Sequence, residues 1–176
     1  TAMFACGLCL YSGEGIGADR ERAVAWFRAA AGQGLSGAMF MLGQCHFFGV
    51  GGVVDRAAGI EWYRRAAEAG SREAAYELGE VHATGRDGGH ADLHEALRWW
   101  RQAGRLGHAR ACLKIAHCYR WGDGVPEDKP LALAWYRRAV NAGDTQANVW
   151  LGECLEHGIG AHADSVLAVA HYRAAA

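Results

Sequence analysis

Cysteine, histidine and acidic residues occur at two spacings that could support metal or redox chemistry. Cys6 and Cys9 form a Cys-x-x-Cys pair, a spacing found in redox-active and zinc-binding sites. A four-thiolate zinc site needs a second such pair, and the sequence has none. His90, Asp92 and His94 have the one histidine and carboxylate spacing that could hold a metal ion. Two imidazoles and one carboxylate are a common surface arrangement, so we expect no metal ion and no cofactor.

The segment Gly13-Glu14-Gly15-Ile16-Gly17 has the glycine content of a phosphate-binding loop. It lacks the Gly-Lys-Ser/Thr ending of such loops, and related segments recur at residues 122–125 and 158–160. A recurring segment of this kind is better explained as a turn between helices. The sequence also has no Ser-x-x-Lys motif, and no set of nucleophile, base and orienting group stands apart from the repeating pattern. We therefore predict no catalytic residues.

A motif of the type Trp-Tyr-Arg-Arg-Ala-Ala recurs five times along the chain. Its copies begin at residues 26, 62, 99, 135 and 171, so the spacing is 36 or 37 residues. A fixed period of this size indicates a solenoid, in which each repeat buries its apolar face against its neighbours. The five expected repeats cover residues 1–37, 38–73, 74–110, 111–146 and 147–176, within one array over 1–176.

Each repeat is expected to form a helix A, a glycine-containing turn and a helix B. An aspartate stands where it would cap each helix B: Asp19, Asp55, Asp92, Asp128 and Asp164. A small residue recurs in the middle of helix A, where it would let another helix approach closely: Gly7, Gly43, Gly79, Ala116 and Gly152. We expect the first aromatic position of helix B to supply the large buried area: Trp26, Trp62, Trp99, Trp135 and, in the last repeat, His171.

The cysteines also follow the repeat. Cys6 takes the position of Leu42 and Leu78, which predicts a core role for it rather than a redox one. Cys9 shares its position with three further cysteines, and all four are expected to be buried between helices. Neighbouring helix axes lie ~8–10 Å apart, whereas a disulfide needs α-carbons within ~7 Å. The following thiols should therefore remain free: Cys9, Cys45, Cys118 and Cys154.

Composition excludes some partner classes. The formal net charge is −1, so no overall field favours nucleic acid or an anionic membrane surface. No apolar run approaches the ~20 residues of a membrane-spanning helix. The arginines of helix B are interspersed with acidic residues and are expected to form a solvated face without an aromatic platform for bases: Arg28, Arg64, Arg65, Arg101, Arg137, Arg138 and Arg173.

The combined pattern over residues 111–143 closely resembles the Sel1-like repeat family. It reads A-x3-L-G-x2-Y-x2-G-x-G-V, followed by D-x3-A-x2-W-Y-x2-A-A-x2-G, with Ala116 in place of the first glycine. That family belongs to the tetratricopeptide-like superfamily. The resemblance implies an all-α, right-handed α/α superhelix of five helix-turn-helix repeats. It also implies that the A helices line a concave face and that the protein binds other proteins.

The resemblance also bears on localisation. Some members of the family join each helix B to the next helix A by a disulfide. Cys112 stands near the second position, but helix B before it has no cysteine, so the chain departs from that secreted subclass. Unpaired cysteines favour the cytoplasm. Because residue 1 is Thr, a leader or further repeats could precede the chain, which leaves a periplasmic or secreted location open.

In the related tetratricopeptide fold, ligand contacts come from helix A positions three before, and one, four and five after, the small residue. Carried over by position, the candidate partner-binding residues are Phe4, Tyr11, Phe40, Gln44, Phe47, Phe48, Tyr76, Glu80, His117, Arg120, Trp121, Glu153 and Glu156. Those of the first half are mainly aromatic, and those of the second half are mainly polar. Phe4 and Phe40 have the alternative of packing against the next helix A.

These features favour a non-enzymatic adaptor that binds a protein or peptide, in a bacterial-type signalling, secretion or toxin-neutralising context. One alternative is an immunity-type or secretion-associated protein that neutralises a partner enzyme. Another is an enzyme of the β-lactam-binding type known among the disulfide-rich relatives. Solenoid ends normally carry polar caps, so the alanine-rich end of repeat 5 makes self-association through the ends a further expectation.

Overall fold

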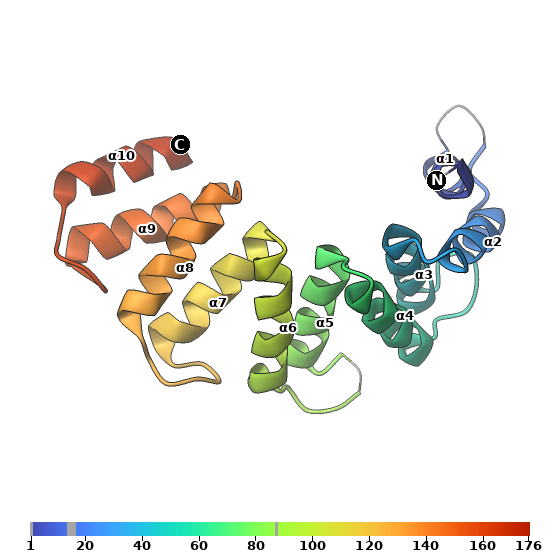
Figure 1. The fold of residues 1–176 in the computed structure, drawn as a ribbon, viewed down its shortest axis with the longest axis horizontal. Coiled ribbons are helices and arrows are strands. Elements are labelled where there is room, and N and C mark those ends of the chain that lie inside the picture. The colour runs from blue at the N-terminus through green and yellow to red at the C-terminus, as the bar shows by residue number, and fades with distance from the viewer. Residues whose placement is uncertain (1, 14–16, 87) are drawn as a thin grey trace. The chain divides into compact units, whose positions relative to one another are not determined.

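The computed structural model describes residues 2–13, 17–86 and 88–176, which form ten α-helices and no strand (Figure 1). The helices are α1 (Ala2–Ser12), α2 (Arg20–Ala31), α3 (Ser36–Phe48), α4 (Arg56–Glu68), α5 (Arg72–Thr84), α6 (Leu93–Arg105), α7 (Ala109–Trp121), α8 (Lys129–Asn141), α9 (Thr145–His157) and α10 (Ser165–Ala175). Odd-numbered helices are the A helices and even-numbered helices are the B helices of five repeats. The all-α prediction is confirmed.

The chain forms two compact units. The N-terminal unit comprises Thr1–Leu78 and Arg86–Gly89, and the C-terminal unit comprises Gly79–Gly85 and His90–Ala176. In the N-terminal unit α1, α2, α3 and α4 each pack against the next helix. In the C-terminal unit the same is true from α6 to α10. Contacts between sequence neighbours are what a repeat fold requires.

Aspartates begin the B helices, as predicted. In each of the five, the carboxylate accepts a hydrogen bond of 2.9–3.0 Å from the backbone N–H three residues later. The residues are Asp19, Asp55, Asp92, Asp128 and Asp164. A cap of this kind satisfies one of the amide groups that a helix leaves unpaired, and contributes about 1 kcal/mol.

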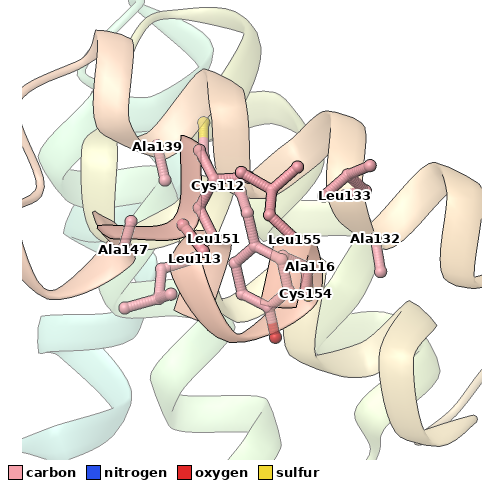
Figure 2. Close-up of a cluster of buried hydrophobic side chains, with 12 residues drawn as sticks. Cys112, Leu113, Ala116, Ala132, Leu133, Ala139, Ala147, Leu151, Cys154 and Leu155 are labelled. Carbon is pink, nitrogen blue, oxygen red and sulfur yellow. The ribbon is translucent and has the colours of Figure 1, made fainter. Parts of the chain in front are cut away.

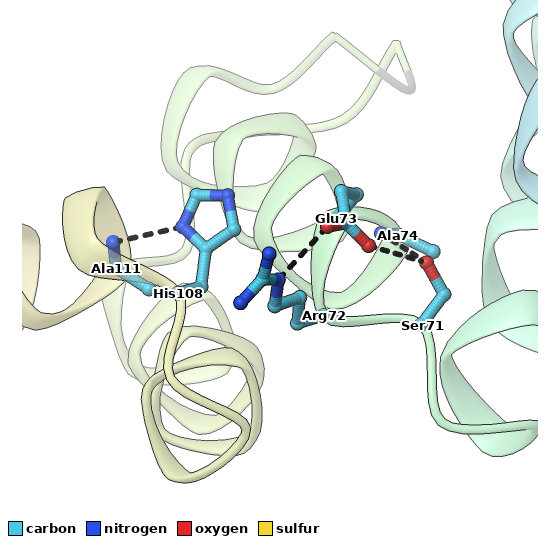
Figure 3. A network of polar contacts seen from close by, with 6 residues as sticks. All are labelled: Ser71, Arg72, Glu73, Ala74, His108 and Ala111. Atoms are coloured by element: carbon cyan, nitrogen blue, oxygen red, sulfur yellow. Dashed lines mark hydrogen bonds and ion pairs between the residues drawn. The ribbon is translucent and has the colours of Figure 1, made fainter. Parts of the chain in front are cut away.

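Several A helices also begin with a side-chain cap, and Figure 3 shows two separate examples. In the N-terminal unit the Ser71 hydroxyl accepts a 3.1 Å hydrogen bond from the Ala74 N–H and donates to Glu73, whose carboxylate also binds Arg72. In the C-terminal unit His108 Nδ1 accepts from the Ala111 N–H at 3.2 Å. A local polar residue therefore caps the start of these helices, whereas α3 begins after Leu35 without a side-chain cap.

Glycines end the A helices. Gly49, Gly122 and Gly158 adopt left-handed backbone angles, with φ of 72°, 76° and 67°. Each donates its N–H to the carbonyl of the cysteine four residues earlier. A left-handed residue without a side chain is a common end of a helix. The recurring glycine segments are therefore turns, although residues 14–16 of the first lie outside the described residues.

The small residue of helix A faces the second aromatic residue of helix B in the same repeat. A Cβ atom added to Gly7, Gly43, Gly79 or Gly152 would lie only 2.3–2.7 Å from a ring atom of the partner aromatic. Those partners are Phe27, Tyr63, Trp100 and Tyr172, respectively. Ala116 shares a core cluster with Tyr136, the corresponding aromatic of repeat 4. The predicted close approach at this position is confirmed.

The prediction that the first aromatic position supplies the main buried area is wrong. Phe27, Tyr63 and Tyr136, at the second position, are at most 1% exposed, whereas Trp26 is 36% exposed and Trp62 is only partly buried. Adjacent residues on a helix point about 100° apart, so only one of the two can face the small residue of helix A. In repeats 1, 2 and 4 the first aromatic lies at the edge of the core, whereas in repeat 3 Trp99 is buried as well.

Arginine side chains accompany these edge tryptophans, contrary to the expected absence of aromatic groups along the helix B arginines. The guanidinium of Arg65 lies 5.0 Å from the Trp62 ring, Arg98 lies 4.9 Å from Trp99, and Arg138 lies 5.1 Å from Trp135. Cation–π contacts of this kind contribute about 0.5–1 kcal/mol at exposed sites. The arginines therefore cover the partly buried rings of Trp62 and Trp135 and the buried ring of Trp99.

The cysteines are all free thiols, but they differ in burial. Cys45, Cys118 and Cys154 are buried as predicted, and burial raises the pKa of Cys45 and Cys118 to about 11. Cys6 and Cys9 are exposed, so the expected core role is wrong for this pair. In the other repeats a preceding helix B packs against helix A, whereas no described helix precedes α1.

The core of the C-terminal unit runs continuously from α7 to α10. Figure 2 shows this cluster of buried side chains. The cluster comprises Cys112, Leu113, Ala116, Ala132, Leu133, Tyr136, Ala139, Ala147, Leu151, Cys154, Leu155 and Ala168. Alternation of small and large side chains lets neighbouring helices interlock, and it holds the A helices in fixed positions.

We predict that Gly43→Ala lowers the free energy of unfolding by about 1–2 kcal/mol, although alanine is the better helix former. The new methyl group would overlap the buried Tyr63 ring and lie 3.1 Å from the Gly59 carbonyl oxygen. Gly37→Ala in the same helix is the control, because its methyl group would lie 3.4 Å from Phe4 at the nearest. Urea denaturation followed by circular dichroism measures both. Equal stability of the two variants would contradict the close contact.

Candidate functional site

The predicted site residues of the N-terminal unit mainly support the core. The rings of Phe4 and Tyr11 lie 5.9 Å and 6.2 Å from Phe27, and the Phe40 ring lies 5.8 Å from Tyr63. All three are partly buried. All three rings contact helix B of their own repeat, and Phe4 also lies against Gly37 of the next helix A, as the alternative expectation had it for this residue.

The end of α3 and the turn after it carry the exposed apolar groups of this unit. Phe48 is 57% exposed, and Val53 and Val54 after it are also exposed. Phe47, in contrast, is 5% exposed, and its ring lies 5.9 Å from Tyr63, so it belongs to the core. Gln44 and Tyr76 are partly buried. Of the predicted residues in this unit, Phe48 is the one most accessible to a partner.

The C-terminal unit holds an aromatic cluster between α7 and α9. The His117 ring lies 4.8 Å from Trp121, 5.0 Å from Trp150 and 5.7 Å from Tyr136, in edge-to-face arrangements. Trp121 and Trp150 are themselves 5.7 Å apart, edge to face. Pairs of aromatic rings in this geometry contribute about 0.5–1.5 kcal/mol beyond the area they bury. Trp121 is therefore held by its neighbours although 47% of it is exposed.

Arg120 packs against two rings of this cluster. Its guanidinium is 5.0 Å from the Trp121 ring and 5.4 Å from the Trp150 ring. It donates to Glu153 at 2.5 Å, and the residue is only 8% exposed. A buried guanidinium needs such a partner, because an unpaired buried charge is strongly destabilising. Arg120 and Glu153, both predicted to bind a partner, are thus first bound to each other.

A second ion pair joins α7 to Glu80 at the end of α5. Lys114 Nζ is 3.1 Å from Glu80 Oε1 and 5.5 Å from the Trp100 ring. The side chain of Glu80 is mostly buried in this arrangement. Glu156, by contrast, is exposed, and it accepts a 2.7 Å hydrogen bond from the Tyr172 hydroxyl. Among the predicted residues of this unit, Trp121 and Glu156 face solvent most openly.

Electrostatics keep His117 neutral. Burial, together with the positive charges of Arg120 and Lys114, lowers the pKa of His117 to about 4. Asp144 and Asp123 oppose this shift. His117 Nε2 and Trp150 Nε1 are buried without a hydrogen-bond partner. The cluster therefore contains an uncharged imidazole packed as an aromatic group.

Sequence reasoning missed Trp150. It stands two positions before the small residue of its helix, a position outside the set carried over from the tetratricopeptide fold. The other repeats have Ala5, Met41, Glu77 and Lys114 at that position, so its chemistry varies along the array. A tryptophan at a position that the scaffold leaves variable is the signal that could have identified it.

Of the candidate metal ligands, Asp92 has a structural role. Its carboxylate caps α6 by accepting a 3.0 Å hydrogen bond from the Glu95 N–H. Within the described residues, no three histidine, cysteine, aspartate or glutamate side chains are grouped to hold a metal ion. No described helix has the length and apolar character needed to cross a membrane.

Comparison with known proteins identifies the repeats. The Sel1 repeat family matches residues 1–35, 36–71, 72–108, 109–144 and 145–176. Each internal boundary falls two residues before the one expected from the motif, at the first residue of helix A. No curated protein matches the chain.

Solved structures agree with this match. A Sel1 repeat protein from Oxalobacter formigenes is 32% identical, with a TM-score of 0.90, over 98% of this chain and 70% of that one. A protective antigen present in uropathogenic Escherichia coli strains, with an SLR fold, is 30% identical with a TM-score of 0.91; the match covers 99% of this chain and 37% of the antigen. An immunity protein from Pseudomonas aeruginosa, 17% identical with a TM-score of 0.50, covers 99% of this chain and 80% of that one, and shares only the fold.

We predict that His117→Gln reduces the loss of stability on acidification. A histidine whose pKa falls from 6.5 unfolded to about 4 folded stabilises the protein fully above pH 6.5. That stability is lost as the pH falls from 6.5 through 4, because the unfolded chain binds the proton more readily. Wild type should therefore lose more stability than His117→Gln over this window, as measured by urea denaturation at several pH values. His157→Gln, at an exposed position, should behave as wild type; a wild-type slope in His117→Gln would contradict the assignment.

Proposed function

Because the chain belongs to the Sel1 repeat family, whose fold is typical of protein–protein interaction modules, we propose that it is a non-enzymatic adaptor that binds a protein or peptide segment. The proposed contact surface is the exposed side of the A helices. It centres on Trp121 in the C-terminal unit, with Phe48 as a separate contact in the N-terminal unit. Sel1 repeat proteins are generally binding scaffolds rather than enzymes, which is consistent with this proposal.

The observation that carries the proposal is that Trp121 is exposed and yet fixed in place. Two rings and one guanidinium hold its indole, as described above. Ordering a flexible side chain on binding costs about 0.5–1.5 kcal/mol, and a side chain held in advance avoids most of that cost. Tryptophan is also enriched among the few residues that dominate binding energy in protein interfaces. Trp121 has the properties of such a residue.

The repeat pattern supports the same conclusion for Phe48. Phe48 and Trp121 are the last residues of their A helices, each directly before a left-handed glycine. The other repeats have Ser12, Thr84 and His157 at this position. Since the scaffold accepts polar residues there, the two aromatic side chains are not needed to build the helix end. Exposed aromatic groups that the fold does not require indicate a role in recognition.

We predict that Trp121→Ala weakens binding of peptides selected on the wild-type protein from a random display library. The expected loss is about thirty-fold, which corresponds to the ~2 kcal/mol of a dominant interface residue. Isothermal titration calorimetry of the selected peptides measures it. Phe48→Ala should weaken those peptides that bind the N-terminal unit.

The matched control is Leu106→Ala, since Leu106 is 45% exposed and lies after α6 in the same unit. It should leave binding unchanged. Circular dichroism must show that Trp121→Ala remains folded. Equal affinity of the peptides for wild type and Trp121→Ala would contradict the proposed site.

A further inference from the structure

Two cations of α7 are already paired with carboxylates within the protein. Arg120 is paired with Glu153, and Lys114 is paired with Glu80. The Arg120 side chain is also only 9% exposed, whereas that of Glu153 is 34% exposed. A partner approaching from solvent therefore meets the carboxylate of this pair more readily than its guanidinium.

Two further exposed carboxylates of this unit have no such compensation. Asp123 stands two residues after Trp121 in the turn after α7. Glu156 is exposed on α9, and its hydrogen-bond donor is the neutral Tyr172 hydroxyl. Neither carboxylate forms an ion pair with a described residue. Asp123 and Glu156 therefore add negative charge to this unit that no ion pair among the described residues offsets.

We propose that the surface around Trp121 selects a cationic protein segment, in which an apolar side chain rests on the indole and adjacent lysine or arginine side chains pair with Asp123 and Glu156. This inference rests on the proposed binding function and names the chemistry of the partner. The acidic surroundings disfavour an acidic segment and a nucleic acid, since both would bring like charge to uncompensated carboxylates. An exposed indole beside carboxylates also suits a cation directly.

The test uses three fluorescein-labelled peptides with blocked termini and the same central leucine. The flanking residues are lysine in the first, glutamine in the second and glutamate in the third. Fluorescence anisotropy measures their binding to wild type, Asp123→Asn, Glu156→Gln and the double variant, at low and at high salt. Glu68→Gln is the matched control, because Glu68 is exposed at the end of α4 in the N-terminal unit and its loss changes the net charge equally.

The lysine peptide should bind most tightly and the glutamate peptide least. Each single neutralisation should weaken the lysine peptide about two- to five-fold at low salt, and the double variant should weaken it further. The difference should shrink at high salt, because exposed charges are screened. Glu68→Gln should leave binding unchanged.

The outcomes separate this inference from the binding function on which it rests. If all three peptides bind equally and Trp121→Ala abolishes binding, the cationic selectivity is wrong and the binding site stands. If the lysine peptide binds Trp121→Ala as well as wild type, the site itself is wrong. Absence of lysine-peptide binding at millimolar concentration, or displacement of that peptide by an equal concentration of spermine, would also overturn the inference; the latter would assign the site to free polycations.

Discussion

The fold depends on one contact that recurs in every repeat, between the small residue in the middle of helix A and the second aromatic ring of helix B. At Gly79 an added Cβ atom would lie 2.3 Å from Trp100, so nothing larger fits without displacing the ring. Glycine in a helix costs about 1 kcal/mol relative to alanine. Burial of an aromatic ring contributes several times that amount, which explains why the contact is favourable. It also sets how helix A is rotated, and hence which of its residues reach solvent.

Because of this rotation, some positions of helix A face the core and others face solvent. One position faces the core and is occupied by Leu42, Leu78, Ile115 and Leu151. Three residues later in repeats 2, 4 and 5 stand the buried cysteines Cys45, Cys118 and Cys154. The last residue of the helix lies beyond the core and directly before a left-handed glycine, where the local backbone sets no requirement on its side chain. Phe48 and Trp121 occupy this position. The scaffold thus provides rigid places at which an exposed side chain can vary without cost to the fold.

The sequence predicts features that are local or periodic. It does not predict burial where this depends on the direction in which a side chain points from its helix. The aspartate caps, the glycine turns and the small helix A position could all be read from spacing, because each acts on its own backbone or on one partner. Spacing could not tell which of two adjacent aromatics, such as Trp62 and Tyr63, faces inward, since both recur with the same period. It also assigned Cys6 to the core by analogy with Leu42, whereas Cys6 is exposed among the described residues.

The candidate site shows the same limit more sharply. Position alone selected Trp121, Arg120 and Glu153 as candidates, but it could not show that Arg120 and Glu153 bind each other. It also included Phe47, one residue from Phe48, which turns into the core. Trp150 was missed because the transferred positions do not include its own. What a repeat pattern leaves undetermined is the set of contacts made between repeats.

Under the proposed function, the ion pair between Arg120 and Glu153 has a role in recognition as well as in stability. Removing two charges from water costs several kcal/mol, and well-packed apolar residues often replace such a pair with no loss of stability. The pair is nevertheless central to the exposed indole: the guanidinium lies over both Trp121 and Trp150, so it fixes the rings that surround it. Because Arg120 is buried and Glu153 is more open to solvent, the pair also holds the rings without presenting a cation at the surface. A neutral apolar replacement would keep the packing but remove the carboxylate that faces a partner.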